Sequence, residues 1–125
     1  MTTESEWTSH LLTKLRVAAV MKEAVVYKHN DWSTKGIPDF SISLAGHTSW
    51  WEVKRAGKFP TKIQYHYLKL LAPAAFVLTF NDETSTVMIE RVRDTNPVKV
   101  IRYDQLVQTV ISYAVTLPFD LRERL

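Results

Sequence analysis

The segment GIPDFSISLAGHTSWWEVKR, residues 36–55, predicts a tight β-hairpin at the centre of the fold. Apolar and polar residues alternate along PDFSISL and again along SWWEVKR, as expected for two strands that each bury one face. Only a few residues separate the two runs, so the connection is a short turn. Three charged side chains, Asp39, Glu52 and Lys54, lie on this hairpin among large apolar residues. Their relative placement decides what the hairpin can do.

The length of the turn decides whether these three charges share a face. Residues paired across an antiparallel hairpin lie on the same face, as do residues two apart along one strand. A two-residue turn at 45–46 pairs Asp39 with Glu52, and a turn at 46–47 pairs Asp39 with Lys54. Either turn brings all three side chains to one face, whereas a three-residue loop would place Asp39 on the other.

Two carboxylates on one face favour a divalent metal site. Asp39 and Glu52 would repel each other and raise each other's pKa unless a cation lay between them. Oxygen ligands of this kind suit Mg²⁺ or Mn²⁺. A metal held there would activate a water and offset the charge on a phosphate, with Lys54 as a neighbouring cation. The alternative is that all three charges form the solvated face of an edge hairpin.

The segments around the hairpin predict one α/β domain. The chain has 125 residues, of which 46% are hydrophobic and 23% charged, which predicts a single globular domain over 1–125 that spans no membrane. Periodicity predicts helices over 4–22, 61–72 and 104–117, and further strands over 24–29, 74–80, 85–92 and 98–103. The second helix is expected to present Ile63, Tyr67, Leu70 and Leu71 on one side, with Thr61 as its N-cap. The predicted order is αβββαβ followed by ββα.

Cysteine content and charge limit the function classes. Because the chain has no cysteine, it can form neither a disulfide framework nor a thiolate metal site. Its first residues lack the pattern of a signal peptide, so we expect a cytoplasmic location, or a nucleoid-associated one in a bacterial or phage-infected cell. A net charge of +3 is mildly basic, which permits nucleic-acid binding without requiring it.

The order of elements and the hairpin motif together resemble a known family. The dipeptide PD at 38–39 and the tripeptide EVK at 52–54, set on the second and third strands, resemble the PD-(D/E)xK nuclease superfamily. With GIPD, WWEVK and a following helix that bears Gln64, residues 4–80 are similar to the VRR-NUC type and to related Holliday-junction resolvases. The resemblance implies a restriction-endonuclease-like αβββαβ core, with a mixed central sheet flanked by helices and followed by C-terminal strands and a helix.

The resemblance also implies a set of site residues. Asp39, Glu52 and the main-chain carbonyl of Val53 would hold Mg²⁺ or Mn²⁺, and Lys54 would position or activate the attacking water. Gln64 would lie beside the metal; the alternative is a surface helix residue.

A glutamate on the first helix is implied as well, and two residues compete for this place. Glu4 shares the apolar face of Trp7, whereas Glu6 fits a capping box with Thr3, so Glu4 is preferred. The alternative is that Glu4 is an ordinary acidic residue of the first helical turn.

Basic residues extend from the hairpin into the second helix and predict contact with a phosphate backbone, unless they form a solvated face. They are Lys35, Arg55, Lys58, Lys62, His66 and Lys69. The expected activity is a Mg²⁺- or Mn²⁺-dependent endodeoxyribonuclease acting on branched DNA such as a Holliday junction. The alternative is a catalytically inactive DNA-binding or subunit-interaction module of the same fold.

Cleavage of a junction needs two nicks, so a homodimer is expected. Apolar residues of the last helix, together with the strand at 85–92, offer a surface for it: Val107, Val110, Tyr113, Val115 and Leu117. Alternatively, this surface covers the sheet of the monomer.

Overall fold

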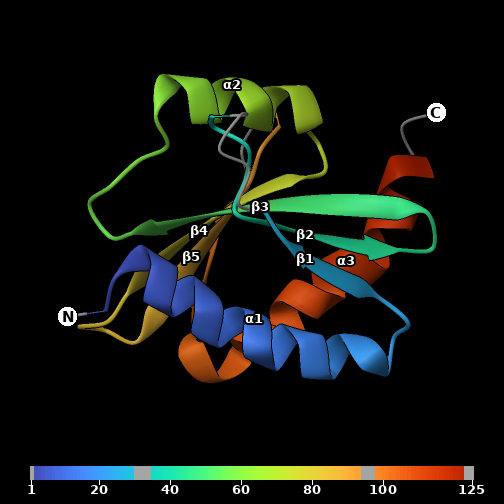
Figure 1. Ribbon diagram of the computed structural model, residues 1–125, viewed down its shortest axis with the longest axis horizontal. Helices are drawn as coiled ribbons and strands as arrows, with labels where there is room; N and C mark the ends of the chain where they lie inside the picture. Colours follow the sequence, from blue (N-terminus) through green and yellow to red (C-terminus); the bar gives the residue numbers. More distant parts are fainter. Residues whose placement is uncertain (1, 30–34, 94–97, 123–125) are drawn as a thin grey trace.

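A six-stranded mixed sheet forms the centre of the computed structural model, which describes residues 2–29, 35–93 and 98–122 but not the side chains of 117–122 (Figure 1). The elements are α1 (Glu4–Val20), β1 (Val25–Lys28), β2 (Phe40–Leu44), β3 (His47–Arg55), α2 (Lys62–Leu71), β4 (Ala75–Asn81), β5 (Thr86–Arg91), β6 (Val98–Arg102), the 3₁₀ turn η1 (Tyr103–Gln105) and α3 (Leu106–Arg122). The order αβββαβ followed by ββα is therefore as predicted. None of the helices in these ranges is long and apolar enough to cross a bilayer.

The strands lie in the sheet in chain order, from β1 at one edge to β6 at the other. All neighbouring pairs are antiparallel except β3 and β4, which are parallel. A parallel pair needs a crossover connection, and α2 supplies it. In Figure 1, α2 lies on one side of the sheet, and α1 and α3 lie on the other.

The face towards α1 and α3 holds the main core. Phe40 pairs with Trp51, and Trp51 pairs with Phe76, so one fully buried aromatic row crosses three strands. The Trp51 and Phe76 rings are stacked, with their centroids 4.2 Å apart. The residues of both helices that pack against this face are buried: Trp7, Leu11, Leu12, Leu15 and Ala19 of α1, and Leu106, Val110, Ile111 and Ala114 of α3.

The opposite face is covered by α2 through a small contact. Leu68 is fully buried and packs against Ala75, Val77 and Val92. Of the apolar residues expected on one side of this helix, Tyr67 and Leu71 are half-buried, whereas Ile63 and Leu70 are 47% and 67% exposed. A single ten-residue helix crosses only part of a six-stranded face, so part of its apolar side stays exposed.

The hairpin turn consists of two residues. Leu44 pairs with His47, which leaves Ala45 and Gly46 as the turn, with φ angles of 51° and 80°. Positive φ at both positions is the type I′ geometry, whose twist matches that of the strands it joins. Of the two registers that the sequence allows, the structure therefore has the one with its turn at 45–46.

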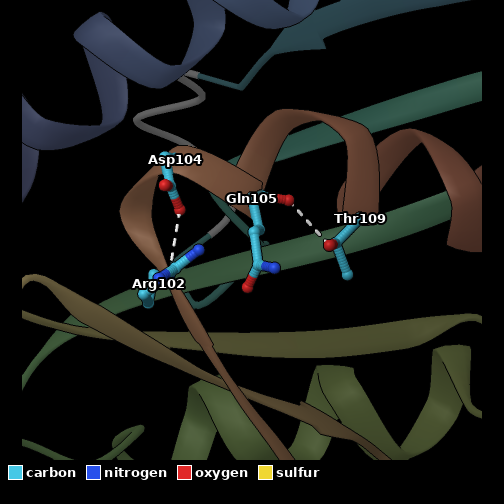
Figure 2. Close-up of polar contacts among 4 residues, drawn as sticks. All are labelled: Arg102, Asp104, Gln105 and Thr109. Atoms are coloured by element: carbon cyan, nitrogen blue, oxygen red, sulfur yellow. Dashed lines mark hydrogen bonds and ion pairs between the residues drawn. The ribbon is translucent and has the colours of Figure 1, made fainter.

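The last strand enters α3 through η1, where polar contacts shape the chain (Figure 2). Thr109 Oγ1 donates to the Gln105 carbonyl at 2.7 Å within the first helical turn. The ion pair between Arg102 and Asp104, 3.3 Å long, is exposed and contributes little to stability.

The apolar face of α3, which we expected at a dimer interface, packs largely inside the monomer. Val110 is fully buried, and Val107, Tyr113 and Val115 pack against the same core. Val87 and Ile89 of β5 are buried as well. The side chain of Leu117 lies outside the described residues. The described side chains among them therefore pack on the monomer's own core, and the homodimer stays a prediction.

Candidate active site

The charged side chains of the hairpin share one face of the sheet, the face that carries α2. Continuing the register of Phe40 with Trp51 by one residue places Asp39 opposite Glu52. Lys54 follows Glu52 by two residues and so points the same way. Glu52 also pairs with Val77, which packs against Leu68 of α2, so the group lies beside that helix.

Glu52 is buried without a full set of partners. It is 2% exposed, and its Oε2 atom has no hydrogen-bond partner among the described residues. Burial is the largest cause that raises the pKa of Glu52, and together with the charge and the hydrogen bond of the Asp39 carboxyl it brings that pKa to about 10. The Lys54 ammonium opposes this shift, whereas Glu4 adds to it. Without a cation, the pair therefore holds a proton at neutral pH.

A proline leaves the Val53 carbonyl without its usual partner in the sheet. The N–H and C=O of one strand residue point to the same neighbour, and those of Val53 point towards β2 because its N–H donates to Asp39 Oδ2 at 2.7 Å. The same register places residue 38 opposite Val53. Since Pro38 has no N–H, it cannot donate to that carbonyl. The carbonyl therefore points to the side on which Asp39 lies, as a metal ligand would.

Glu4 reaches the same end of β3 from the first turn of α1. Its Oε2 accepts from the Arg55 N–H at 3.0 Å, so Glu4 takes the place of a strand partner beyond the end of β2. Trp7 holds this turn in position by stacking on Phe80 at 4.7 Å. Glu6 is exposed, and its N–H donates to the Thr3 side chain at 3.1 Å. Of the two glutamates, Glu4 is the one that faces the sheet, as the helical-face argument predicts.

A polar cavity of about 550 Å³ opens beside Asp39. It is lined by Thr3, Glu4, Ser5, Thr8, Lys28, His29, Asp39 and Arg55. Lys28 and His29 were not among the residues expected here. The only local signal for them is strand alternation over 24–29, which does not say which strand lies next to β1.

His29 is held firmly at the rim of this cavity. Its main-chain N–H donates to the Asp39 main-chain carbonyl at 2.9 Å, and its ring Nε2 lies 2.9 Å from Ser41 Oγ. The ring stacks on Trp50 at 5.1 Å. Burial lowers the pKa of His29, so the neutral ring predominates at pH 7.

Gln64 has a structural role in α2. Its Oε1 accepts from the Thr61 N–H at 2.9 Å, while the Thr61 hydroxyl accepts from the Gln64 N–H at 3.3 Å. This reciprocal pair is a capping box. Gly36 packs against the same turn: a Cβ there would lie 3.0 Å from the Ile63 carbonyl carbon and 3.1 Å from the Gln64 nitrogen. Gly36 also has a φ of 86°, so glycine is needed on both counts.

The predicted DNA-binding residues divide into two groups. Arg55 is half-buried and lines the cavity. The others are exposed: Lys35, Lys58, Lys62, His66 and Lys69. Lys69 Nζ lies 4.9 Å from the centre of the Tyr65 ring on the same helix. The cations of α2 therefore form a solvent-facing strip, separate from Arg55.

The donor set fits a hard divalent cation. Within the described ranges, no three His, Asp or Glu side chains group closely enough to hold a metal. The candidate ligands are therefore two carboxylates, Asp39 and Glu52, and the Val53 carbonyl. Mg²⁺ and Mn²⁺ are commonly held by one or two carboxylates and keep several waters. The unpartnered Glu52 Oε2 is the atom that such a cation would satisfy.

Comparison with known proteins does not identify a family for this chain. No protein-family model matches the chain, and a search of curated proteins finds no significant match.

Proposed function

We propose that this protein is a Mg²⁺- or Mn²⁺-dependent endodeoxyribonuclease built on a restriction-endonuclease-like core. The observation that carries the proposal is the contact between the Asp39 and Glu52 carboxyl groups, with Lys54 beside them on one face of the hairpin. A buried carboxyl group in contact with a half-buried one destabilises the fold unless the pair does chemistry or binds a cation. A hairpin that presents them together with a lysine suits phosphodiester hydrolysis.

The side chains have distinct roles in this proposal. A bound metal would lower the pKa of a water and offset charge on the scissile phosphate. Asp39 and Glu52 hold the cation with the Val53 carbonyl. Lys54 favours the ionised form of Glu52 and positions the attacking water.

The other predicted site residues act less directly. Glu4 fixes the end of β3 through the Arg55 N–H and adds negative charge near Glu52. Gln64 can approach the metal only by leaving its capping box, so we assign it to the support of α2.

The proposed substrate is branched DNA such as a Holliday junction, and the proposed setting is the cytoplasm or nucleoid. The exposed cations on and before α2 would contact phosphates outside the cleavage site. Resolution of a junction requires a nick in each of two strands, which a homodimer provides with two equivalent sites.

The test is cleavage of an end-labelled four-way junction and of a matched linear duplex, with EDTA, Mg²⁺ or Mn²⁺. We expect metal-dependent nicking that falls at least about a hundredfold in Asp39→Ala and in Lys54→Ala, because each removes a group that acts in the transition state. The control variant is Lys14→Ala, an exposed α1 lysine, which should cleave at the wild-type rate. Equal nicking by Asp39→Ala and wild type, or no nicking at all, would sink the proposal.

The roles of the two N-terminal glutamates are tested by a pair of substitutions. Glu4→Ala is expected to lower cleavage at least about tenfold, because it releases the end of β3 from α1. Glu6→Ala is expected to retain cleavage, because its side chain is exposed. The opposite result in the same gel assay would show that Glu6 is the acidic residue of the site.

One observation favours the inactive DNA-binding module instead. Glu52 and Lys54 are only 2% and 9% exposed, so a substrate does not reach them directly. The same experiment separates the two functions: an inactive module binds the junction with equal affinity with and without metal, and it leaves the DNA intact.

A further inference from the structure

The cavity beside Asp39 contains a lysine that the proposed chemistry does not use. Lys28 is the last residue of β1, is half-buried and lines the cavity together with Arg55. Its ammonium forms no ion pair of 4.0 Å or less with any residue in the described ranges. An anion bound in this cavity would stabilise the half-buried ammonium of Lys28.

Each carboxylate in the cavity accepts a main-chain hydrogen bond from the end of β3. Glu4 Oε2 accepts from the Arg55 N–H, and Asp39 Oδ2 accepts from the Val53 N–H. One oxygen of each carboxylate is therefore engaged at the end of β3, and neither carboxylate lies within 4.0 Å of the Lys28 ammonium.

We propose that Lys28 binds a backbone phosphate of DNA in this cavity when the neighbouring metal site is filled. The inference rests on the proposed function, and it names a substrate-binding residue next to that site: Lys28 pairs with Phe40, so its side chain points to the α1 side of the sheet, into the cavity that Asp39 also lines. The remaining lining suits a phosphate: the Arg55 side chain and the hydroxyls of Thr3 and Ser5 add donors. The cavity also lies at the first turn of the seventeen-residue helix α1, whose N-terminal partial charge is positive.

The charge in the cavity makes phosphate binding depend on the metal. Asp39 and Glu4 line the same cavity and would repel a phosphate on their own. A divalent cation bound at Asp39 offsets that charge, so occupation of the cavity by phosphate is expected to depend on metal. This dependence separates Lys28 from the exposed lysines of α2, whose contact with DNA does not pass through the carboxylates.

The test measures binding of a fluorescent four-way junction by anisotropy, in Ca²⁺ and in EDTA, over a series of salt concentrations. Ca²⁺ takes oxygen ligands, and a gel run on the same samples checks that the DNA stays intact. In Ca²⁺, Lys28→Gln is expected to weaken binding about three- to tenfold and to reduce the slope of log K against log salt by about 1. Lys28→Arg keeps the charge and is expected to stay within about twofold of wild type.

Lys14→Gln is the matched control, since it removes the same charge from an exposed position on α1. Thermal unfolding of each variant checks that it is folded, and Lys28→Arg keeps the test valid if Lys28→Gln is unstable. The proposal is overturned if Lys28→Gln matches Lys14→Gln in Ca²⁺, or if its defect is equally large in EDTA. Inorganic phosphate that displaces the junction from wild type but not from Lys28→Gln would support the same site.

The outcomes keep this inference apart from the proposed nuclease function. Wild-type cleavage in Mg²⁺ with no effect of Lys28→Gln on binding leaves the nuclease standing and removes Lys28 from its site. A metal-dependent Lys28 effect on binding without cleavage in Mg²⁺ or Mn²⁺ supports the phosphate site and overturns the nuclease. No DNA binding by wild type overturns both.

Discussion

At the scale of single residues, Glu52 is the side chain whose chemistry departs most from that of an ordinary residue of its type. A glutamate in water has a pKa near 4.5, whereas burial and the adjacent Asp39 raise that of Glu52 to about 10. The metal-free folded protein therefore binds a proton that the unfolded chain does not bind between these two pH values. By linkage, its free energy of unfolding falls as pH rises across that window.

Replacement of Glu52 by glutamine removes this titration. In EDTA, wild type is expected to lose at most about 1.4 kcal/mol of stability per pH unit between pH 6 and 8 from this group. Glu52→Gln is expected to show a flatter dependence and to be more stable than wild type at pH 8. Urea unfolding at pH 6, 7 and 8 measures both curves, and parallel curves would show that Glu52 ionises normally.

At the scale of elements, the site depends on a strand that outruns its partner. β3 continues to Arg55, but β2 begins only at Phe40, so the last residues of β3 have no β2 residue opposite them. Asp39 and Glu4 accept the N–H groups that would otherwise be unpaired there. The carbonyl of Val53 has no N–H opposite it on the β2 side, because the residue there is Pro38.

A substitution at Pro38 tests this account of the carbonyl. Pro38→Ala supplies an N–H that competes with the metal for the Val53 carbonyl, and one such hydrogen bond is worth about 0.5–1.5 kcal/mol. We expect Mn²⁺ affinity, measured by calorimetry, to fall about two- to tenfold. Pro60→Ala, in the loop before α2, is the control and should bind Mn²⁺ like wild type. Unchanged Mn²⁺ affinity in Pro38→Ala would mean that the carbonyl is not a ligand.

At the scale of the whole molecule, the periodicity of the sequence predicts the helices and strands well, but it predicts less well which of them lie side by side. Alternation placed Phe40 and Trp51 on the core face because period and burial agree there. It could not choose between turns at 45–46 and 46–47, because both put the same residues on the same face. Nor could it find Lys28, whose place in the site comes from pairing between β1 and β2 across a connection of eleven residues, 29–39.

The helices show the same limit. The apolar side of α2 is visible in the sequence, but the area of sheet beneath it is not, and so the exposure of Ile63 and Leu70 could not be predicted. For α3 the apolar residues are as predicted, and only the three-dimensional structure shows that they cover the monomer's own sheet.

The proposed homodimer is tested by sedimentation of the protein alone and with a four-way junction. We expect two chains per junction, because each strand that is cut needs its own site. Since α3 packs largely within the monomer, a dimer is expected to form mainly on the DNA and to be sparse without it. One chain per junction, with both strands cut, would contradict the dimer.

The burial of Glu52 beside α2 also bears on the rate at which a metal ion could reach it. Gly36 packs closely on the first turn of α2, and Glu52 lies in the same layer with almost no contact with solvent. On the proposed function, an ion would enter through the cavity beside Asp39 and would reach the Glu52 carboxylate only when the segments around Glu52 move apart. The rate of metal uptake would then be set by how often the protein opens, and it would become independent of ion concentration once the ion is abundant. Such a protein would respond slowly to a change in metal supply, however tightly it binds the ion at equilibrium.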